Sequence, residues 1–155
     1  MHSRIFQVGL EPISKENYIE ESNYYDHWFT TTFADYVSDD CDRKEDIKWL
    51  QDCYGTKGIE FGTDDNGEYF IVKSKQTYFE DSFKEFTKLV HEITEYTLDD
   101  FAHGMYEVGL LRRAYEDKYS FYVDEDEELM TFDSFVRLCE MEEKYYIGGT
   151  VDYHL

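Results

Sequence analysis

The densest group of side chains able to do chemistry is the run of five carboxylates at residues 124–128, within YVDEDEELMTFDSF. A calcium loop of the EF-hand type needs oxygen ligands at alternate positions, a glycine at the sixth, and a final glutamate between two helices. This stretch has no glycine and is expected to follow a strand, so it predicts no calcium site. Its local interpretation is a solvated loop that joins a strand to a helix capped by Thr131.

Other candidate ligands and nucleophiles do not form a recognisable site. His91 and Glu95 are four residues apart on an expected helix, but the metalloprotease pattern needs a second histidine at the latter position. The cysteines are odd in number and lack a CxxC pair, which indicates neither a disulfide framework nor a zinc site; they are Cys41, Cys53 and Cys139. We therefore predict no metal and no cofactor.

Catalytic motifs are absent from the sequence. There is no GxSxG nucleophile elbow, and neither GxGxxG nor GxxxxGK[ST] is present to cradle a phosphate. A carboxylate pair among the 36 acidic residues remains possible, because acid–base catalysis needs only two suitably placed groups. The sequence predicts a protein that is not an enzyme, with a carboxylate-based hydrolase or metal-dependent enzyme as an alternative.

The charge balance bounds the class of partner. The chain has 15 basic and 36 acidic residues, a net charge of -21. Such a chain is repelled by nucleic acid and by anionic membranes, and it associates fast with basic surfaces in a salt-sensitive way. Its apolar runs are too short for a membrane span, and its N-terminus MHSRIFQVGL lacks the apolar segment of a signal peptide. We expect a cytoplasmic protein that binds a basic protein and does not bind nucleic acid directly.

Imitation of nucleic-acid phosphates is possible only under one condition. A DNA duplex carries one charge per ~1.7 Å of its axis, so 21 charges correspond to about ten base pairs. Spread over a whole folded surface, this charge is about four times less dense than on DNA, so the acidic residues would have to cluster on one face. The residues that we predict to contact a partner are Asp124, Glu125, Asp126, Glu127, Glu128, Asp39, Asp40, Asp42, Asp64, Asp65 and the aromatic anchor Tyr106.

In composition, though not in any motif, the chain resembles the small acidic inhibitors by which phages block nucleic-acid-binding enzymes, such as antirestriction and anti-CRISPR proteins. The resemblance implies an acidic stoichiometric inhibitor that binds the basic nucleic-acid-binding surface of a nuclease or another defence protein. An immunity protein that neutralises a basic toxin domain is the alternative from the same class, since it would use the same electrostatic attraction.

The elements expected to position these residues form one α+β domain, residues 1–155, with a mostly antiparallel sheet and four to five helices on one face. Residues 4–10 alternate as a strand, and residues 24–37 fit a helix or a strand. Asp42 is expected to cap a helix that ends at Gly55. The Asn66-Gly67 dipeptide predicts a hairpin that places Glu60 opposite Lys73.

The second half of the chain predicts two antiparallel helices followed by further strands. Apolar residues recur at helical spacing over 76–96 and again over 98–116, the second run beginning at a capping pattern at Thr97. Residues 118–124 alternate as a strand, and Thr131 is expected to cap the next helix. A last strand over 144–155 is expected to carry a bulge at Gly148-Gly149, with Tyr145 and Tyr146 on different sides, one buried and one exposed.

Overall fold

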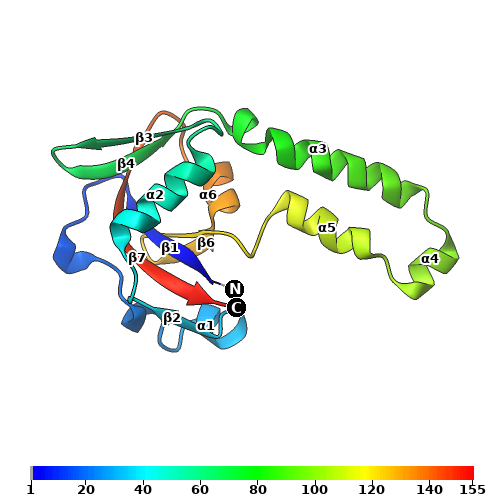
Figure 1. Cartoon of the computed structure of the whole chain (residues 1–155), viewed down its shortest axis with the longest axis horizontal. Helices are drawn as coiled ribbons and strands as arrows, with labels where there is room; N and C mark the ends of the chain where they lie inside the picture. Colours follow the sequence, from blue (N-terminus) through cyan, green and yellow to red (C-terminus); the bar gives the residue numbers. More distant parts are fainter. Residues whose placement is uncertain (1) are drawn as a thin grey trace.

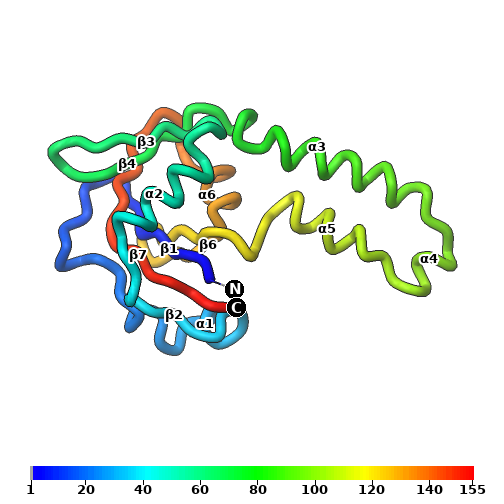
Figure 2. The backbone as a smooth tube through the Cα atoms, in the orientation of Figure 1, coloured from blue at the N-terminus to red at the C-terminus, as the bar shows by residue number. Residues whose placement is uncertain are grey.

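The computed structural model describes residues 2–155 as a body built around one sheet and an arm that projects from it (Figure 1). The arm comprises residues 75–115, and all other described residues belong to the body. The chain leaves the body after the hairpin β3–β4 and re-enters it before β5, while both termini lie on the body (Figure 2). No helix within residues 2–155 is long and apolar enough to cross a membrane.

The sheet confirms the α+β class. Within residues 2–155 it has seven strands, with the order β3-β4-β7-β1-β5-β6 and β2 paired to β7. β1 and β5 are parallel and the other pairs are antiparallel, so the sheet is mixed. The strands are β1 (His2–Gly9), β2 (Tyr36–Ser38), β3 (Ile59–Asp64), β4 (Gly67–Val72), β5 (Tyr122–Glu125), β6 (Glu128–Thr131) and β7 (Lys144–His154).

Both faces of the sheet are covered, because neighbouring residues along its central strands are apolar on both sides. Phe6 of β1 packs under the helices α2 (Arg43–Tyr54) and α6 (Phe132–Leu138), whereas Ile5 packs into a second cluster on the other face. That second cluster includes Phe29 of the short helix α1 (Trp28–Thr32). The expectation of helices on a single face therefore holds only for α2 and α6. For the same reason Tyr145 and Tyr146 are both buried, contrary to our prediction.

Within the body, the predicted helix ends and the predicted bulge are confirmed, whereas residues 24–37 form two elements instead of one. Asp42 caps α2 by accepting hydrogen bonds from two backbone amides, Gly55 ends that helix, and β7 carries the expected bulge at its glycine pair, where its pairing with β1 shifts by one residue. Residues 24–37 are divided between α1 and β2, after the short 3₁₀ turns η1 (Lys15–Asn17) and η2 (Glu21–Tyr24). The predicted strand and helix alternatives for that segment were thus each correct for a part of it.

The β3–β4 hairpin forms as predicted, but its turn lies one residue earlier in the chain, so each residue of β3 is paired two positions away from its predicted partner. Asp64 pairs with Gly67, whose φ of 126° is accessible to glycine, so the turn residues are 65 and 66. Glu60 consequently lies opposite Ile71. Lys73 forms its ion pair with Glu142 instead.

The arm is a helical hairpin, as predicted, with a break in its second half. α3 (Lys75–Thr94) packs along α5 (Tyr106–Tyr115), and the short α4 (Leu98–His103) forms the tip (Figure 1). The expected single helix over 98–116 is interrupted at Gly104, where φ is 96°. Leu98 and Phe101, which belong to the apolar pattern over 98–116, are exposed at this tip.

Candidate functional site

The acidic run at residues 124–128, hereafter the acidic turn, is the tip of a β-hairpin rather than a loop leading into a helix. Glu125 pairs with Glu128, so the two turn residues are Asp126 and Glu127, with φ of 51° and 68°. Turns of this kind normally use Asn-Gly because both central residues need positive φ. Our sequence prediction missed β6 because the Asp-Glu pair lacks the glycine that usually marks such a turn, although Thr131 does cap α6 as predicted.

The carboxylates of the acidic turn have different roles. Asp124 accepts a 2.7 Å hydrogen bond from the Tyr24 hydroxyl, and burial together with the negative charge of this aspartate raises the pKa of that tyrosine. Burial, reinforced by the charges of Asp126 and Glu128, raises the pKa of Glu125. Asp126, Glu127 and Glu128 are exposed. Asp124 is thus tied to the fold, while the remainder of the turn faces solvent or borders a cleft.

That cleft, hereafter the acidic cleft, has a volume of about 830 Å³ and lies between the acidic turn, the end of β1 and the segment that follows it. Parallel pairing of β1 with β5 forms it, because Val8 and Glu125 are partners and both strands end at this edge. Five carboxylates line it: Glu11, Asp124, Glu125, Asp126 and Glu127. Among the described residues that line the cleft there is no lysine or arginine, so its potential is strongly negative.

The second predicted acidic group is divided between structural and exposed roles. Asp42 caps α2. Asp64 accepts hydrogen bonds from the Lys144 ammonium at 2.7 Å and the Tyr146 hydroxyl at 3.0 Å, and the lysine interaction is the main cause of its lowered pKa. The exposed members of the group, for which no such side-chain bond holds the carboxylate, are Asp39, Asp40 and Asp65.

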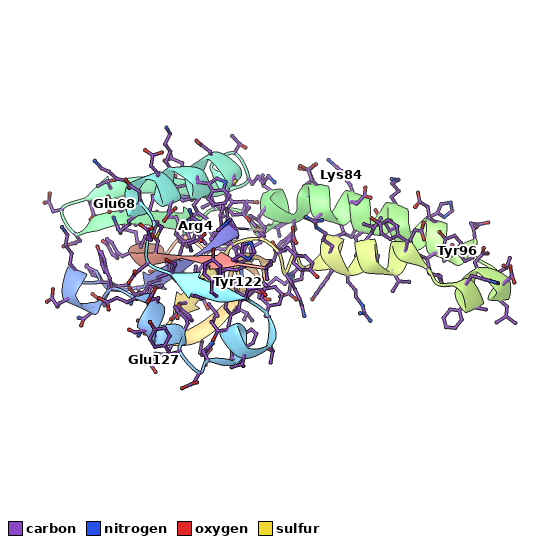
Figure 3. The ribbon with its side chains drawn as sticks, turned by 60° about the horizontal axis from the view of Figure 1, so that its bottom comes forward. Arg4, Glu68, Lys84, Tyr96, Tyr122 and Glu127 are labelled. Carbon is purple, nitrogen blue, oxygen red and sulfur yellow. The ribbon has the colours of Figure 1, made fainter. Side chains whose placement is uncertain are left out.

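The two acidic groups lie on different parts of the body. β2 precedes Asp39, Asp40 and Asp42, and the β3–β4 hairpin carries Asp64 and Asp65. β2 and β4 pair with β7, whereas β5 pairs with β1. Two strands, β7 and β1, therefore separate them. In the view of Figure 3, Glu68 near the second group and Glu127 of the acidic turn lie toward opposite sides of the body. Tyr106 is on the arm at the start of α5, away from both groups.

Negative charge is concentrated in the body. The arm has eight acidic and five basic residues, a net charge of -3, so -18 of the total of -21 belongs to the rest of the chain. Several cations of the body are also neutralised internally, because Arg43 pairs with Glu68, Lys144 with Asp64, and Arg4 with buried Asp46. Few cations of the body are left to offset its exposed carboxylates.

A second concave site, hereafter the junction cleft, lies where the arm meets the body and has a volume of about 620 Å³. Its walls include the aromatic side chains of Trp49, Tyr54 and Tyr119. Asp133 also lines it, and burial raises the pKa of this carboxyl. The Tyr78 hydroxyl and a backbone amide each donate a hydrogen bond to Asp133, at 2.8 and 2.9 Å. Tyr78 is itself buried.

Sequence reasoning missed the junction cleft because its lining comes from segments that are distant in the sequence and meet only where the base of the arm joins the body. Within residues 2–155, no group of three or more His, Cys, Asp or Glu side chains is arranged to hold a metal ion. Cys41, Cys53 and Cys139 are free thiols, and burial is the main cause of the raised pKa of each. A raised pKa disfavours the nucleophilic thiolate at neutral pH.

No family model, no curated protein and no solved structure matches this chain. Function is therefore inferred from the residues of the chain itself, above all from the two clefts.

Proposed function

We propose that the protein is an acidic stoichiometric inhibitor that binds the basic nucleic-acid-binding surface of a nuclease or another defence protein in the cytoplasm. The acidic cleft carries this proposal, since five carboxylates and no lysine or arginine line it within residues 2–155. A free protein gains nothing by grouping like charges, because their repulsion opposes folding. A cationic partner relieves that repulsion.

The chemistry of the cleft suits arginine and lysine side chains. Nucleases hold phosphates with these residues, and a guanidinium binds a carboxylate through two parallel hydrogen bonds as readily as it binds a phosphate. A cation next to Glu125 would favour its ionised form and lower the raised pKa of this residue. The negative field of the body would also steer a basic partner during the encounter.

The placement of the acidic groups favours local occupation over imitation of a whole duplex. The acidic turn and the second group are separated by β7 and β1, so they do not form one continuous row of charges. We infer that the inhibitor occupies a few cationic side chains at the partner's phosphate-binding site and blocks the remainder sterically.

The experiment is affinity capture on the immobilised chain from a host lysate at low and high salt, followed by a competition assay with each recovered protein. We expect a basic nucleic-acid-binding protein that loses its nucleic acid when one equivalent of this chain is added. The triple variant Asp126→Asn/Glu127→Gln/Glu128→Gln should associate more slowly and with a weaker salt dependence. The matched control Asp39→Asn/Asp40→Asn/Asp65→Asn removes the same charge from the other group.

Two results would refute the proposal. One is a partner that binds this chain and its nucleic acid simultaneously. The other is equal loss of affinity in the triple variant and its control, because that would assign the effect to net charge rather than to the acidic cleft. A recovered toxin whose activity is neutralised without competition for nucleic acid would instead support the immunity protein, the alternative that uses the same attraction.

A carboxylate-based hydrolase is the alternative from another class, and the junction cleft is the observation that favours it. Asp133 has the raised pKa expected of a general acid and lies in a concave site with several aromatic side chains in its walls. Both of its oxygens accept hydrogen bonds from the protein, however, which is how a structural carboxylate is held. Hydrolysis of an ester or glycoside substrate that is lost in Asp133→Asn, in a protein that still folds, would favour this alternative.

A further inference from the structure

One side of the arm carries an uncharged row of residues that α5 leaves partly uncovered. Its members recur along α3 at alternating spacings of three and four, the pattern of a coiled-coil contact, and we term them the seam: Gln76, Phe79, Phe83, Phe86, Val90 and Ile93. α5 covers a neighbouring side of α3, where Leu89 is buried. Only part of the seam has a partner within the chain, since Phe86 approaches the ring of Tyr115 while Phe83 is largely exposed.

The charged residues of α3 lie off the seam and neutralise one another. Lys84 forms ion pairs with Glu80 and Asp81, and Lys88 does so with Glu85 and Glu92. α3 as a whole has four acidic and three basic residues, a net charge of -1 in a chain of net charge -21. The seam is thus the part of the surface at which this acidic protein can approach a like-charged molecule most easily.

We propose that the seam binds a second copy of this chain, with the two α3 helices antiparallel about a two-fold axis between Phe86 and Thr87. This arrangement places Phe83 of one copy opposite Val90 of the other, because the two positions are equally distant from the axis. A large side chain then faces a smaller one on both sides of the axis, as efficient packing requires. The proposal is independent of the inhibitor function, which depends on the body.

Electrostatics favour this antiparallel arrangement over other contacts between copies. From Lys75, where the arm joins the body, to the axis is about 12 residues, or about 18 Å along a helix, so the two bodies would attach about 35 Å apart. The Debye length is about 8 Å at physiological ionic strength, so the repulsion between bodies of net charge -18 would be largely screened. Contact between two bodies, or parallel arms, would bring those charges much closer.

The exposed apolar area of the arm is sufficient for such a dimer. Val90 is 39% exposed, Tyr115 55%, Phe83 65%, Phe101 71% and Leu98 83%. With 150–250 Å² for each aromatic side chain, these five expose about 600 Å² per copy, or about 1,200 Å² for two. Specific interfaces bury about 1,200–2,000 Å², which is reached when the polar neighbours of the seam are included. The antiparallel arrangement also carries the apolar tip of each arm to the base of the other.

The test is sedimentation equilibrium of the full chain over a range of concentrations up to about 100 µM. We expect twice the mass of the chain, and a dissociation constant that rises about tenfold or more in Phe83→Glu, since exposed aromatic anchors dominate such contacts. The matched control is His91→Glu, which adds one negative charge at another exposed position of α3. It should dimerise like the natural chain, and unchanged circular dichroism should show that both variants are folded.

Cross-linking tests the orientation. Copies with Phe83→Cys mixed with copies with Val90→Cys should form a heterotypic disulfide under mild oxidation, faster than either variant forms one with itself. A chain that is monomeric at every concentration overturns the proposal, as does a dimer that survives Phe83→Glu. Preferential self-cross-linking of the Phe83→Cys copies would exclude the antiparallel register. Binding of a different protein to the seam of a monomeric chain would also refute the second copy as its occupant.

Discussion

Relieving backbone strain in the acidic turn should stabilise the protein. Asp126 and Glu127 have φ of 51° and 68°, a left-handed region that glycine adopts freely and that asparagine and aspartate tolerate, but that is disfavoured for other residues such as glutamate. The double substitution Asp126→Asn/Glu127→Gly installs the dipeptide that two-residue hairpin turns prefer. It also removes two negative charges beside Glu125, whose pKa is raised in part by that neighbourhood.

The expected gain follows from two opposing contributions. A side chain in the left-handed region costs roughly 1–2 kcal/mol, and most of this is recovered at Glu127 when glycine replaces it. Glycine also makes the unfolded chain more flexible, which costs about 0.4–1 kcal/mol. The asparagine and the reduced charge repulsion add a few tenths, so we expect the free energy of unfolding to rise by about 1 kcal/mol. In a domain of this size that corresponds to a melting temperature about 2–4 °C higher.

Thermal unfolding followed by circular dichroism, together with urea titration, measures this gain. The control Asp126→Asn/Glu127→Gln removes the same charges but keeps a side chain at φ of 68°, so it should recover only the electrostatic part. The difference between the two variants isolates the backbone contribution. Equal melting temperatures would refute the reasoning, because they would show that the turn relaxes at no cost. Both variants should lose partner association to a similar extent, since both remove the carboxylates.

Two further predictions concern stability. Gly148→Ala should destabilise the protein by about 1–3 kcal/mol in urea titration, because a methyl group there would overlap the side-chain oxygen of Gln7. Gly109→Ala in α5, where nothing lies near the added carbon, should instead stabilise by about 0.5–1 kcal/mol; destabilisation there would contradict the helix assignment. A third prediction concerns the dependence of stability on pH. The pKa of Glu125 is higher in the folded than in the unfolded protein, so this residue binds its proton more tightly when the protein is folded. Its contribution to the free energy of unfolding is therefore present at low pH and is lost as the pH rises through the pKa of the folded state. Glu125→Gln should therefore be the more stable protein at neutral pH, with the difference disappearing in acid.

Elements marked by local chemistry were predictable from the sequence. Four predicted features depend only on residues a few positions apart, and all four are present. They are the cap of α2 at Asp42, the end of α2 at Gly55, the capping box at Thr97 and the bulge at the glycine pair of β7. The β6 strand was not predictable, because its turn at residues 126 and 127 contains no glycine and the alternation on its two sides is short. The interruption of the helix at Gly104 was also not predictable, because the apolar residues on both sides of it continue one helical pattern.

The candidate site was predictable only as a list of acidic residues. Its concave shape depends on parallel pairing of Val8 with Glu125, residues more than a hundred positions apart, and no local pattern encodes that contact. The division of the second group has a similar origin: Asp64 is bound by Lys144 because β4 and β7 are neighbours. The sequence thus shows which residues are acidic, but whether a carboxylate is bound by another side chain of the protein depends on the fold.

Two surfaces at which the chain departs from the rules of a self-sufficient fold are candidates for selection by something other than folding. The acidic turn combines left-handed φ with adjacent like charges, although Asn-Gly would be more stable there. The seam leaves Phe83 exposed on a helix whose charged side chains are all arranged elsewhere. Each departure costs stability in the isolated chain and is relieved by one kind of contact, a cation at the turn and an apolar helix at the seam. Because the first lies on the body and the second on the arm, a dimer through the seam would leave both acidic clefts free, and each copy would bind its own basic partner.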